Sequence, residues 1–543
     1  MPSSASGGFI FEGMAPCLSH CRTLFLRLSS HATVGLAWAA GSFAVAALCC
    51  HLVTHHPFYD ECIHIRHLWR LSIGDRAHHD FWCSYPISAY VLTLPFFRLL
   101  PEAAISVLAL RALMFVPLAA LAALFAWHAR RVGSPAVWGV VPFAMLASTP
   151  GVARFLVEYS TDHWAALAAG AALMLMLTAS QPHAVGAAAY LSILSLFFAP
   201  KYFWYLIPGG LAMFATACVT TRAALRVLAW AVGGVLLALL TVIILHAAVR
   251  VSLWDELLWV FVVQARYNVS RMMPRLAFFV LQFLLAHWWI AILLGAGLVG
   301  AWRSRSHATW RQWGPQGAIL AGTVVSLLAL RQGGAQYFAP VLLTLLLFVP
   351  YAGRCFGSRQ TQVLLTLLMA MLACAVCCWN LARATRDFVR TPLNTREDPA
   401  PHLVVSMTMP GVHRLYAMQK LLDMIPRDER VVAVWYMHPL FRRDLTFVTQ
   451  DDRPSLVPLM PPHHPIRCQF DPTTFYSALT AAPPAYISPV WLGQNYPPGW
   501  MEVCRDFVNS TNLYELITIA GERAFLRKDL LPGSLLPGSG LNF

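Results

Sequence analysis

Apolar runs of roughly bilayer length recur along most of this chain. A helix needs about 20 consecutive apolar residues to cross the hydrocarbon core of a membrane. About eleven such runs occur, near residues 32–53, 106–127, 135–152, 164–179, 184–199, 202–219, 225–248, 276–299, 316–330, 337–352 and 361–380. The composition agrees, because 58% of the residues are hydrophobic and only 12% are charged. These values exclude an ordinary soluble enzyme and predict a polytopic α-helical membrane protein.

Charged residues between the apolar runs predict the orientation of the chain. Pairs and triplets of arginine follow the even-numbered runs: Arg130 and Arg131, Arg222 and Arg226, Arg303, Arg305 and Arg311, and Arg354 and Arg359. Arginine-rich loops are typical of the cytoplasmic side, which also accounts for the net charge of +14 without nucleic acid as a partner. We therefore expect a cytoplasmic lead over 1–31, a transmembrane domain over 32–381, and outer loops at 54–105, 153–163 and 249–275. Residues 1–31 lack the compact design of a signal peptide.

Two segments depart from this pattern. The apolar stretch 85–104 is interrupted by three prolines and an arginine, so we expect a juxtamembrane helix at the surface and not a span. The outer loop 249–275 carries four arginines against Asp255 and Glu256, contrary to the positive-inside rule. Either the orientation is reversed there, or the loop binds an anionic ligand.

From residue 382 onward the composition becomes that of a soluble domain. The segments "DERVVAVWYMHPLF" and "AFLRK" predict short strands, and "VHRLYAMQKLLDMI" has the apolar spacing of a helix. We expect residues 382–543 to form an extracytoplasmic domain of mixed α/β structure. Cys468 and Cys504 could form a disulfide in an oxidising compartment, although spacing alone does not pair them.

The first outer loop places two adjacent carboxylates directly after the first apolar run. In a helix, Asp60 and His64 would share one face at i,i+4, with Glu61 beside them. A carboxylate here could be a general base, with His64 as a hydrogen-bond partner or metal ligand. The alternative is that Asp60 and Glu61 only stabilise the N-terminus of a helix.

A second acidic site and a lysine share the same expected side. Glu158 and Asp162 precede the run 164–179, and Lys201 and Tyr202 lie between two runs at the outer boundary. Ionisable groups at membrane depth are costly and tend to be functional, and a lysine suits a phosphate. The alternatives are helix capping by Thr161 or Asp162 and snorkelling of Lys201 to the interface.

Further candidates are weaker. Arg331 and Tyr337 recur at a later outer turn, "RQGGAQYFAP", which an ordinary helix-breaking turn would also explain. Arg266 and Arg271 belong to the basic loop 249–275. The motif His78-His79-Asp80 lacks the further ligands of a metal site, and neither a Walker loop nor a GxGxxG motif after a strand occurs, so ATP-driven transport and dinucleotide chemistry lack support.

The first outer loop, "YDECIHIRHLWRLSIGDRAHHDFWCSYPISAYVLTLPFFRLL", resembles that of membrane glycosyltransferases with the C-type (GT-C) fold. The bacterial relatives of protein mannosyltransferases and of the lipid A aminoarabinose transferase (glycosyltransferase family 39-like) are the most similar group. The match consists of Asp60-Glu61, His64, the stretch 69–74, Asp80 with the aromatic pair after it, and Pro86. Weaker similarities cover "EYSTDHWAALAAG", where Asp162 matches but its usual basic and proline neighbours are replaced, "FFAPKYFWYLIPG" and "AQYFAPVLL".

The resemblance implies a GT-C-like fold and an enzyme of a bacterial cytoplasmic membrane with its active site on the outer, periplasmic face. Such enzymes transfer a sugar, with inversion, from a polyprenyl phosphate to a hydroxyl of a lipid, glycan or protein acceptor. Asp60 would be the base, with Glu61, Asp162 and His64 as positioning groups. Lys201 and arginines such as Arg266, Arg271 or Arg331 would stabilise the leaving phosphate. The sequence specifies no cofactor; a divalent cation held by Asp60 and Asp162 remains an alternative.

Two other classes of function remain open. A secondary transporter or lipid flippase could use the acidic residues as a proton relay, although transporters usually place such groups near mid-membrane and show internal repeats. A non-catalytic polyprenyl-binding or assembly protein would keep the basic residues without needing Asp60. The sequence identifies neither the sugar nor the acceptor.

Overall fold

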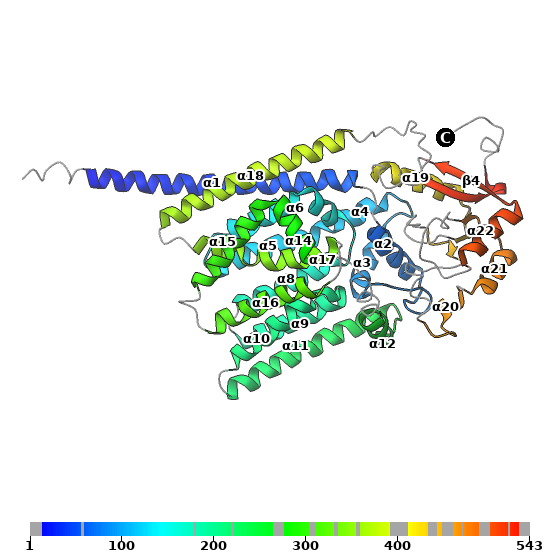
Figure 1. Cartoon of the computed structure of the whole chain (residues 1–543), viewed down its shortest axis with the longest axis horizontal. Helices are drawn as coiled ribbons and strands as arrows, with labels where there is room; N and C mark the ends of the chain where they lie inside the picture. Colours follow the sequence, from blue (N-terminus) through cyan, green and yellow to red (C-terminus); the bar gives the residue numbers. More distant parts are fainter. Residues whose placement is uncertain are drawn as a thin grey trace, which may run out of the picture.

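The computed structural model describes residues 14–55, 59–178, 181–218, 221–263, 276–304, 310–330, 335–354, 359–390, 411–432, 442–447, 460–469, 471–487, 500–519 and 522–531. The molecule is elongated and mainly helical. A bundle of helices makes up most of its length, and a small domain with a β-sheet lies at one end (Figure 1). We call this the sheet end of the molecule.

Long apolar helices confirm the class of fold that the composition predicts. Four stretches of helix in the described residues are long and apolar enough to cross a membrane: Leu28–Thr54, Ser106–Arg131, Arg222–Ala248 and Gln360–Val389. They belong to α1 (Met14–Thr54), to α4 (Ser106–Leu113) with α5 (Phe115–Arg131), to α11 (Thr221–Ala248) and to α18 (Arg359–Arg390). Helices α1 and α18 pack side by side along the edge of the bundle (Figure 1).

Other apolar runs form bent or shorter helices. Helix α6 (Val137–Ser148) meets α7 (Pro150–Val157) at 90°, and α14 (Leu276–Ala286) meets α15 (Trp288–Ser304) at 106°. The first bend follows from Pro150, because the residue before a proline is driven out of the helical conformation; Thr149 is extended, with a ψ of 124°. Counting each bent pair as one span gives up to six spans among the described residues. The expected eleven spans therefore stay a prediction.

The remaining helices of the bundle have 20 residues or fewer. They are α8 (Asp162–Thr178), α9 (Pro182–Phe198), η1 (Pro200–Tyr202), α10 (Phe203–Ala217), α12 (Leu253–Glu256), the π-helix η2 (Leu257–Val263), α16 (Trp310–Ala329), α17 (Ala335–Leu346) and η4 (Val349–Arg354).

The first expected outer loop folds into two helices at the sheet end. Helix α2 (Tyr59–Ser72) follows α1, and α3 (Ser88–Leu99) occupies the stretch expected to lie at the membrane surface (Figure 1). Helix α3 has 12 residues, fewer than the roughly 20 that a span needs. One face of α3 is buried, at Tyr90, Leu94 and Phe97, and the other is exposed, at Leu92 and Leu99. Its position at the membrane surface stays a prediction.

The C-terminal domain combines helices with a five-stranded sheet. Its elements are α19 (Gly411–Met424), β1 (Arg430–Val432), β2 (Thr446–Phe447), α20 (Pro465–Gln469), α21 (Pro472–Ala481), β3 (Tyr486–Ile487), α22 (Trp500–Thr511), β4 (Tyr514–Ile519), β5 (Glu522–Arg527) and η8 (Lys528–Leu530). The strand order is β2-β1-β3-β5-β4, parallel from β2 to β3 and antiparallel from there. The expected helix is confirmed as α19, and the expected strands are confirmed at β1 and β5, while residues 433–441 lie outside the described part. Helix α18 continues to Arg390, past the expected boundary at 381.

The suggested disulfide of this domain is not formed. Cys468 and Cys504 are both free. Cys504 lies on α22 with its side chain in the core beside Phe507 and Tyr514, whereas Cys468 lies on α20 and is exposed. The sequence left this pairing open, and in the structure one thiol is exposed while the other is buried.

Hydrogen bonds fix the C-terminal domain onto α2 and onto the segment between α3 and α4. The Trp69 indole donates to the Arg442 carbonyl at 2.8 Å, and the backbone N–H of Ala104 donates to Gln419 Oε1 at 2.9 Å. The Arg443 N–H donates to the Glu102 carboxylate at 3.2 Å. These bonds involve groups on both sides of the junction, so the sheet domain and the first outer loop form one connected unit.

Candidate active site

The two carboxylates that follow the first apolar run lie in the first turn of α2. Negative charge is favourable at this position because the unpaired N–H groups at a helix N-terminus carry partial positive charge. The position of Asp60 and Glu61 therefore agrees with the alternative that they stabilise a helix N-terminus. This alternative does not explain their different surroundings, because Glu61 is completely buried and Asp60 is only partly buried.

Glu61 is neutralised by an arginine from α4. Arg111 Nε and Nη2 donate to the two Glu61 oxygens at 2.8 and 2.6 Å, and both side chains have no exposed surface. The backbone N–H of Tyr159 donates to the same carboxylate at 3.1 Å. Arg111 and the Tyr159 N–H occupy both oxygens of this carboxylate, so Glu61 serves to position its neighbours.

Glu158 adds a carboxyl group to this region, besides those of Asp60, Glu61 and Asp162. Its Oε1 lies 2.6 Å from His55 Nε2, and the side chain is largely buried. Burial raises the pKa of Glu158 well above its usual value, and the nearby Glu61 charge raises the pKa further. Glu158 is therefore favoured in its neutral, hydrogen-bonding form.

Asp162 and Lys201, which the sequence places 39 residues apart, form an ion pair of 2.6 Å. Asp162 starts α8, where its backbone N–H donates to Ser160 Oγ at 3.1 Å, and Lys201 lies in the short helix η1. Burial lowers the pKa of Lys201, while the charges of Asp162 and Asp60 oppose this effect. Lys201 is thus electrostatically coupled to both aspartates. Tyr202, beside Lys201, is buried.

Both ring nitrogens of His64 are used inside the protein. Nδ1 lies 2.6 Å from the Tyr90 hydroxyl, and Nε2 lies 3.3 Å from Ser160 Oγ. Burial lowers the pKa of His64 well below its usual value, and the positive charge of Lys201 lowers it further. His64 is therefore a neutral, fixed group, and a direct contact with substrate through its nitrogens would require breaking these bonds.

The structure brings six of the ten candidate residues to the sheet end. They are Asp60, Glu61, His64, Asp162, Lys201 and Tyr202; together with Arg111 and Glu158 we call them the charged cluster. The candidates Arg266, Arg271 and Arg331 lie outside the described residues. The backbone of Tyr337 belongs to α17, and its side chain lies outside the described part.

The structure gives no support to a metal site. Within the described ranges, no group of three or more His, Cys, Asp or Glu side chains could hold a metal ion. The His78-His79-Asp80 motif does not converge, because His78 is buried against Trp82 while the exposed His79 contacts Asp80. The Asp162 carboxylate, considered as a ligand with Asp60, binds Lys201 instead.

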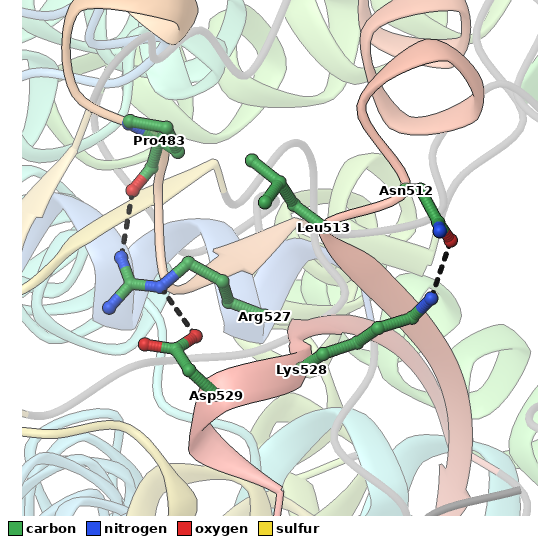
Figure 2. A pocket seen from close by; sticks show the side chains of 6 residues that line it. All are labelled: Pro483, Asn512, Leu513, Arg527, Lys528 and Asp529. Atoms are coloured by element: carbon green, nitrogen blue, oxygen red, sulfur yellow. Dashed lines mark hydrogen bonds and ion pairs between the residues drawn. The ribbon is translucent and has the colours of Figure 1, made fainter.

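A separate hollow lies in the C-terminal domain (Figure 2). Its lining residues are Pro483, Asn512, Leu513, Arg527, Lys528 and Asp529. Arg527 pairs with Glu429 and Asp529 at 2.8 Å each, and Lys528 Nζ donates to Asn512 Oδ1 at 2.6 Å. The cations in this hollow are therefore already paired, and the hollow shares no residue with the charged cluster.

Sequence reasoning overlooked Arg111, the strongest partner in the charged cluster. It falls inside the apolar run 106–127, and an arginine within such a run is costly unless it has a partner. This cost is the sequence signal that Arg111 needs a buried partner. The sequence does not identify that partner, because Glu61 lies 50 positions away and only the packing of α2 against α4 brings the two side chains together.

Comparison with known proteins adds no identification. No protein-family model matches the chain, and no curated protein matches its sequence. The charged cluster and the apolar helices beside it are therefore the features that point to a function.

Chemically, the charged cluster combines one partly buried carboxylate with one lysine. Lys201 interacts electrostatically with both Asp60 and Asp162, while Glu61 forms an ion pair with Arg111. Such a site can accept a proton at Asp60 and can stabilise negative charge that develops near Lys201. These two abilities are what an acyl, phosphoryl or glycosyl transfer without a protein nucleophile requires.

Proposed function

We propose that this protein is an integral membrane glycosyltransferase. It transfers a sugar, with inversion, from a polyprenyl phosphate to an acceptor hydroxyl at the outer face of a bacterial cytoplasmic membrane. The observation that carries the proposal is that Asp60, in the first turn of α2, interacts electrostatically with Lys201, which forms a 2.6 Å ion pair with Asp162. A lipid-linked donor suits this arrangement because its polyprenyl tail requires an apolar environment and its phosphate requires a polar one.

The reaction assigns one role to each side chain. The acceptor oxygen attacks the anomeric carbon, the bond from that carbon to the phosphate oxygen breaks, and Asp60 takes the acceptor proton. A single displacement inverts the anomeric configuration. Polyprenyl phosphate leaves with an additional negative charge, which Lys201 stabilises. Glu61 and Arg111 cancel each other's charge, so Asp60 keeps the role of base.

The position of the charges favours an enzyme over a transporter. Transporters bind their substrates near mid-membrane, between repeated halves. Helix α2, which carries Asp60, lies at the sheet end of the bundle and contacts the C-terminal domain through Trp69 (Figure 1). A site next to a soluble domain is accessible to a bulky acceptor. This supports group transfer at one surface.

The decisive experiment measures sugar transfer directly. Purified protein in lipid nanodiscs is incubated with a panel of polyprenyl-phosphate sugars and candidate acceptors, and the release of polyprenyl phosphate is followed by mass spectrometry. Wild type is compared with Asp60→Asn, which keeps the shape of the side chain and removes the base. We expect a loss of kcat of at least about 100-fold, within the range attributed to general base catalysis.

A matched control separates the base from a general loss of charge. Asp506→Asn makes the same chemical change at an exposed aspartate of α22, whose ion pair in the described part of the chain is with its neighbour Arg505. This variant should leave kcat unchanged. Equal turnover by wild type and Asp60→Asn would reject Asp60 as the base. Absence of turnover with every donor, combined with lipid movement between leaflets, would favour a flippase.

A further inference from the structure

Tyr85 connects the loop before α3 to the proposed base. Its hydroxyl donates to Asp60 Oδ1 at 3.3 Å. The ring lies against the His64 imidazole, with 4.3 Å between ring centroids and 42° between the ring planes. A tyrosine packed in this way has little freedom to turn its hydroxyl away from the carboxylate.

The loop that carries Tyr85 is fixed on both sides. The Cys83 thiol donates to the Tyr85 carbonyl at 3.1 Å. Two residues after Tyr85, the Ile87 N–H donates to the buried Glu256 carboxylate at 2.8 Å. The backbone position of Tyr85 is thus determined by contacts that do not involve Asp60.

His64 provides a rigid platform for the Tyr85 ring. Its two nitrogens contact Tyr90 on α3 and Ser160 before α8, so rotation of the imidazole would break a hydrogen bond at either end. The Tyr90 hydroxyl also lies 3.2 Å from His67 Nδ1. Both nitrogens of His64 are engaged within the protein, so its contribution to the site is to hold the Tyr85 ring in place beside Asp60.

We propose that Tyr85 is a positioning residue that orients Asp60 by binding its Oδ1, so that Oδ2 receives the acceptor proton. This inference rests on the proposed function, because it names a supporting residue of the same site. In the transfer step the proton moves from the acceptor hydroxyl to Asp60, and Tyr85 keeps its own proton. A donor to a carboxylate also favours the charged form, which is the form a base needs.

Two titratable groups from neighbouring elements interact with Asp60. They are Lys201 on η1 and Glu158 in the segment before α8, and Asp162 pairs with Lys201. Glu61, the next residue on α2, is neutralised by Arg111. These groups are unchanged by Tyr85→Phe, so that substitution isolates the contribution of the phenolic hydroxyl.

The first test measures the hydrogen bond without requiring turnover. Protein labelled with 13C-aspartate is titrated in nanodiscs by NMR, and the Asp60 signal is assigned from its absence in Asp60→Asn. We expect Tyr85→Phe to move the Asp60 titration midpoint to higher pH, because the carboxylate loses a donor while the ring packing is kept. Tyr476→Phe, an exposed tyrosine on α21, is the matched control and should cause no shift. An unchanged midpoint in Tyr85→Phe would overturn the inference.

The second test uses the transfer assay. Tyr85→Phe should lower kcat by about 10- to 100-fold, the effect expected for one hydrogen bond to a charged group. The KM for the donor should stay constant, and the acidic limb of the pH profile should move to higher pH. A parallel loss of folded protein, or a change in KM alone, would indicate a structural role and contradict the proposal. If wild type transfers no sugar, the proposed function fails, and the titration alone still decides whether Tyr85 orients Asp60.

Discussion

Arg111 Nη2 lies 2.6 Å from Glu61 Oε2, and neither side chain is exposed. The remaining nitrogen of the guanidinium, Nη1, donates to the carbonyls of Leu52 and His55 at 2.7 Å each. Because Leu52 belongs to α1 and His55 directly follows it, one arginine ties α1, α2 and α4 together. The group that fixes the sheet end is therefore also the group that neutralises the neighbour of Asp60.

Removing one charge of this pair should destabilise the protein strongly. Glu61→Gln leaves the Arg111 charge buried without a full partner, which typically costs about 3–5 kcal/mol. We expect a clear fall in the apparent melting temperature of the purified protein, measured by light scattering or intrinsic fluorescence. Removing both charges, with Glu61→Leu and Arg111→Met, should restore part of the loss.

The exposed pair Arg505–Asp506 supplies the control for this experiment. Asp506→Asn breaks an ion pair whose side chains are at least half exposed, and water screens such pairs. Its melting temperature should match that of wild type. If Glu61→Gln behaves like Asp506→Asn, the buried pair does not hold the sheet end together.

The ion pair of Asp162 with Lys201 should determine the alkaline limit of activity. Lys201 must be protonated to stabilise the leaving phosphate, its pKa is lowered by burial, and the Asp162 charge opposes that lowering. Asp162→Asn therefore lowers the Lys201 pKa further. We expect the alkaline limb of the kcat/KM profile to move to lower pH in the variant, while an unmoved limb would show that Lys201 does not control it.

Glu158 should make the stability of the protein fall as the pH rises. Its pKa in the folded protein is raised well above the ordinary value of 4.5, so the folded state holds this proton more tightly than the unfolded state. The stabilisation is complete below the unfolded pKa and is lost as the pH passes through the folded pKa. Glu158→Gln, which cannot ionise, should melt like wild type at low pH and at a higher temperature above neutrality. Parallel melting curves at all pH values would contradict this assignment.

How much of this structure could be predicted depends on whether the determinants are local. The apolar runs that become α1, α11 and α18 specify long helices by themselves, because a membrane requires each backbone group to be bonded within its own segment. The number of spans does not follow from this information, because apolar content alone does not show whether a run forms one straight span or, as at Pro150, two helices that meet at 90°.

The charged cluster shows the same limit. The first-turn position of Asp60 and Glu61 follows from the local sequence, because it depends only on where α2 begins. The partners do not follow, because Arg111 and Lys201 reach their carboxylates through contacts between helices distant in sequence. Adjacent carboxylates with identical local patterns thus acquire different chemical roles.

Close packing of α9 against α11 provides a test of the bundle itself. A Cβ atom added to Gly234 would lie 2.1 Å from the Gly186 carbonyl oxygen, so the two helices approach each other where both residues are glycine. Small residues permit such approach between membrane helices. Gly234→Ala must separate the backbones, which typically costs about 1–3 kcal/mol. We expect a lower melting temperature in detergent.

The adjacent glycine gives the matched control. A Cβ atom added to Gly233 meets nothing within 4 Å, and the residue is exposed on the other side of α11. Alanine is the better helix former, so Gly233→Ala should leave the melting temperature equal or raise it, by about 0.5–1 kcal/mol of helix propensity. Both variants replace glycine by alanine at adjacent positions of α11, and they differ in that only the alanine at 234 would meet Gly186. Equal stability of Gly233→Ala and Gly234→Ala would therefore show that α9 and α11 do not pack through these glycines.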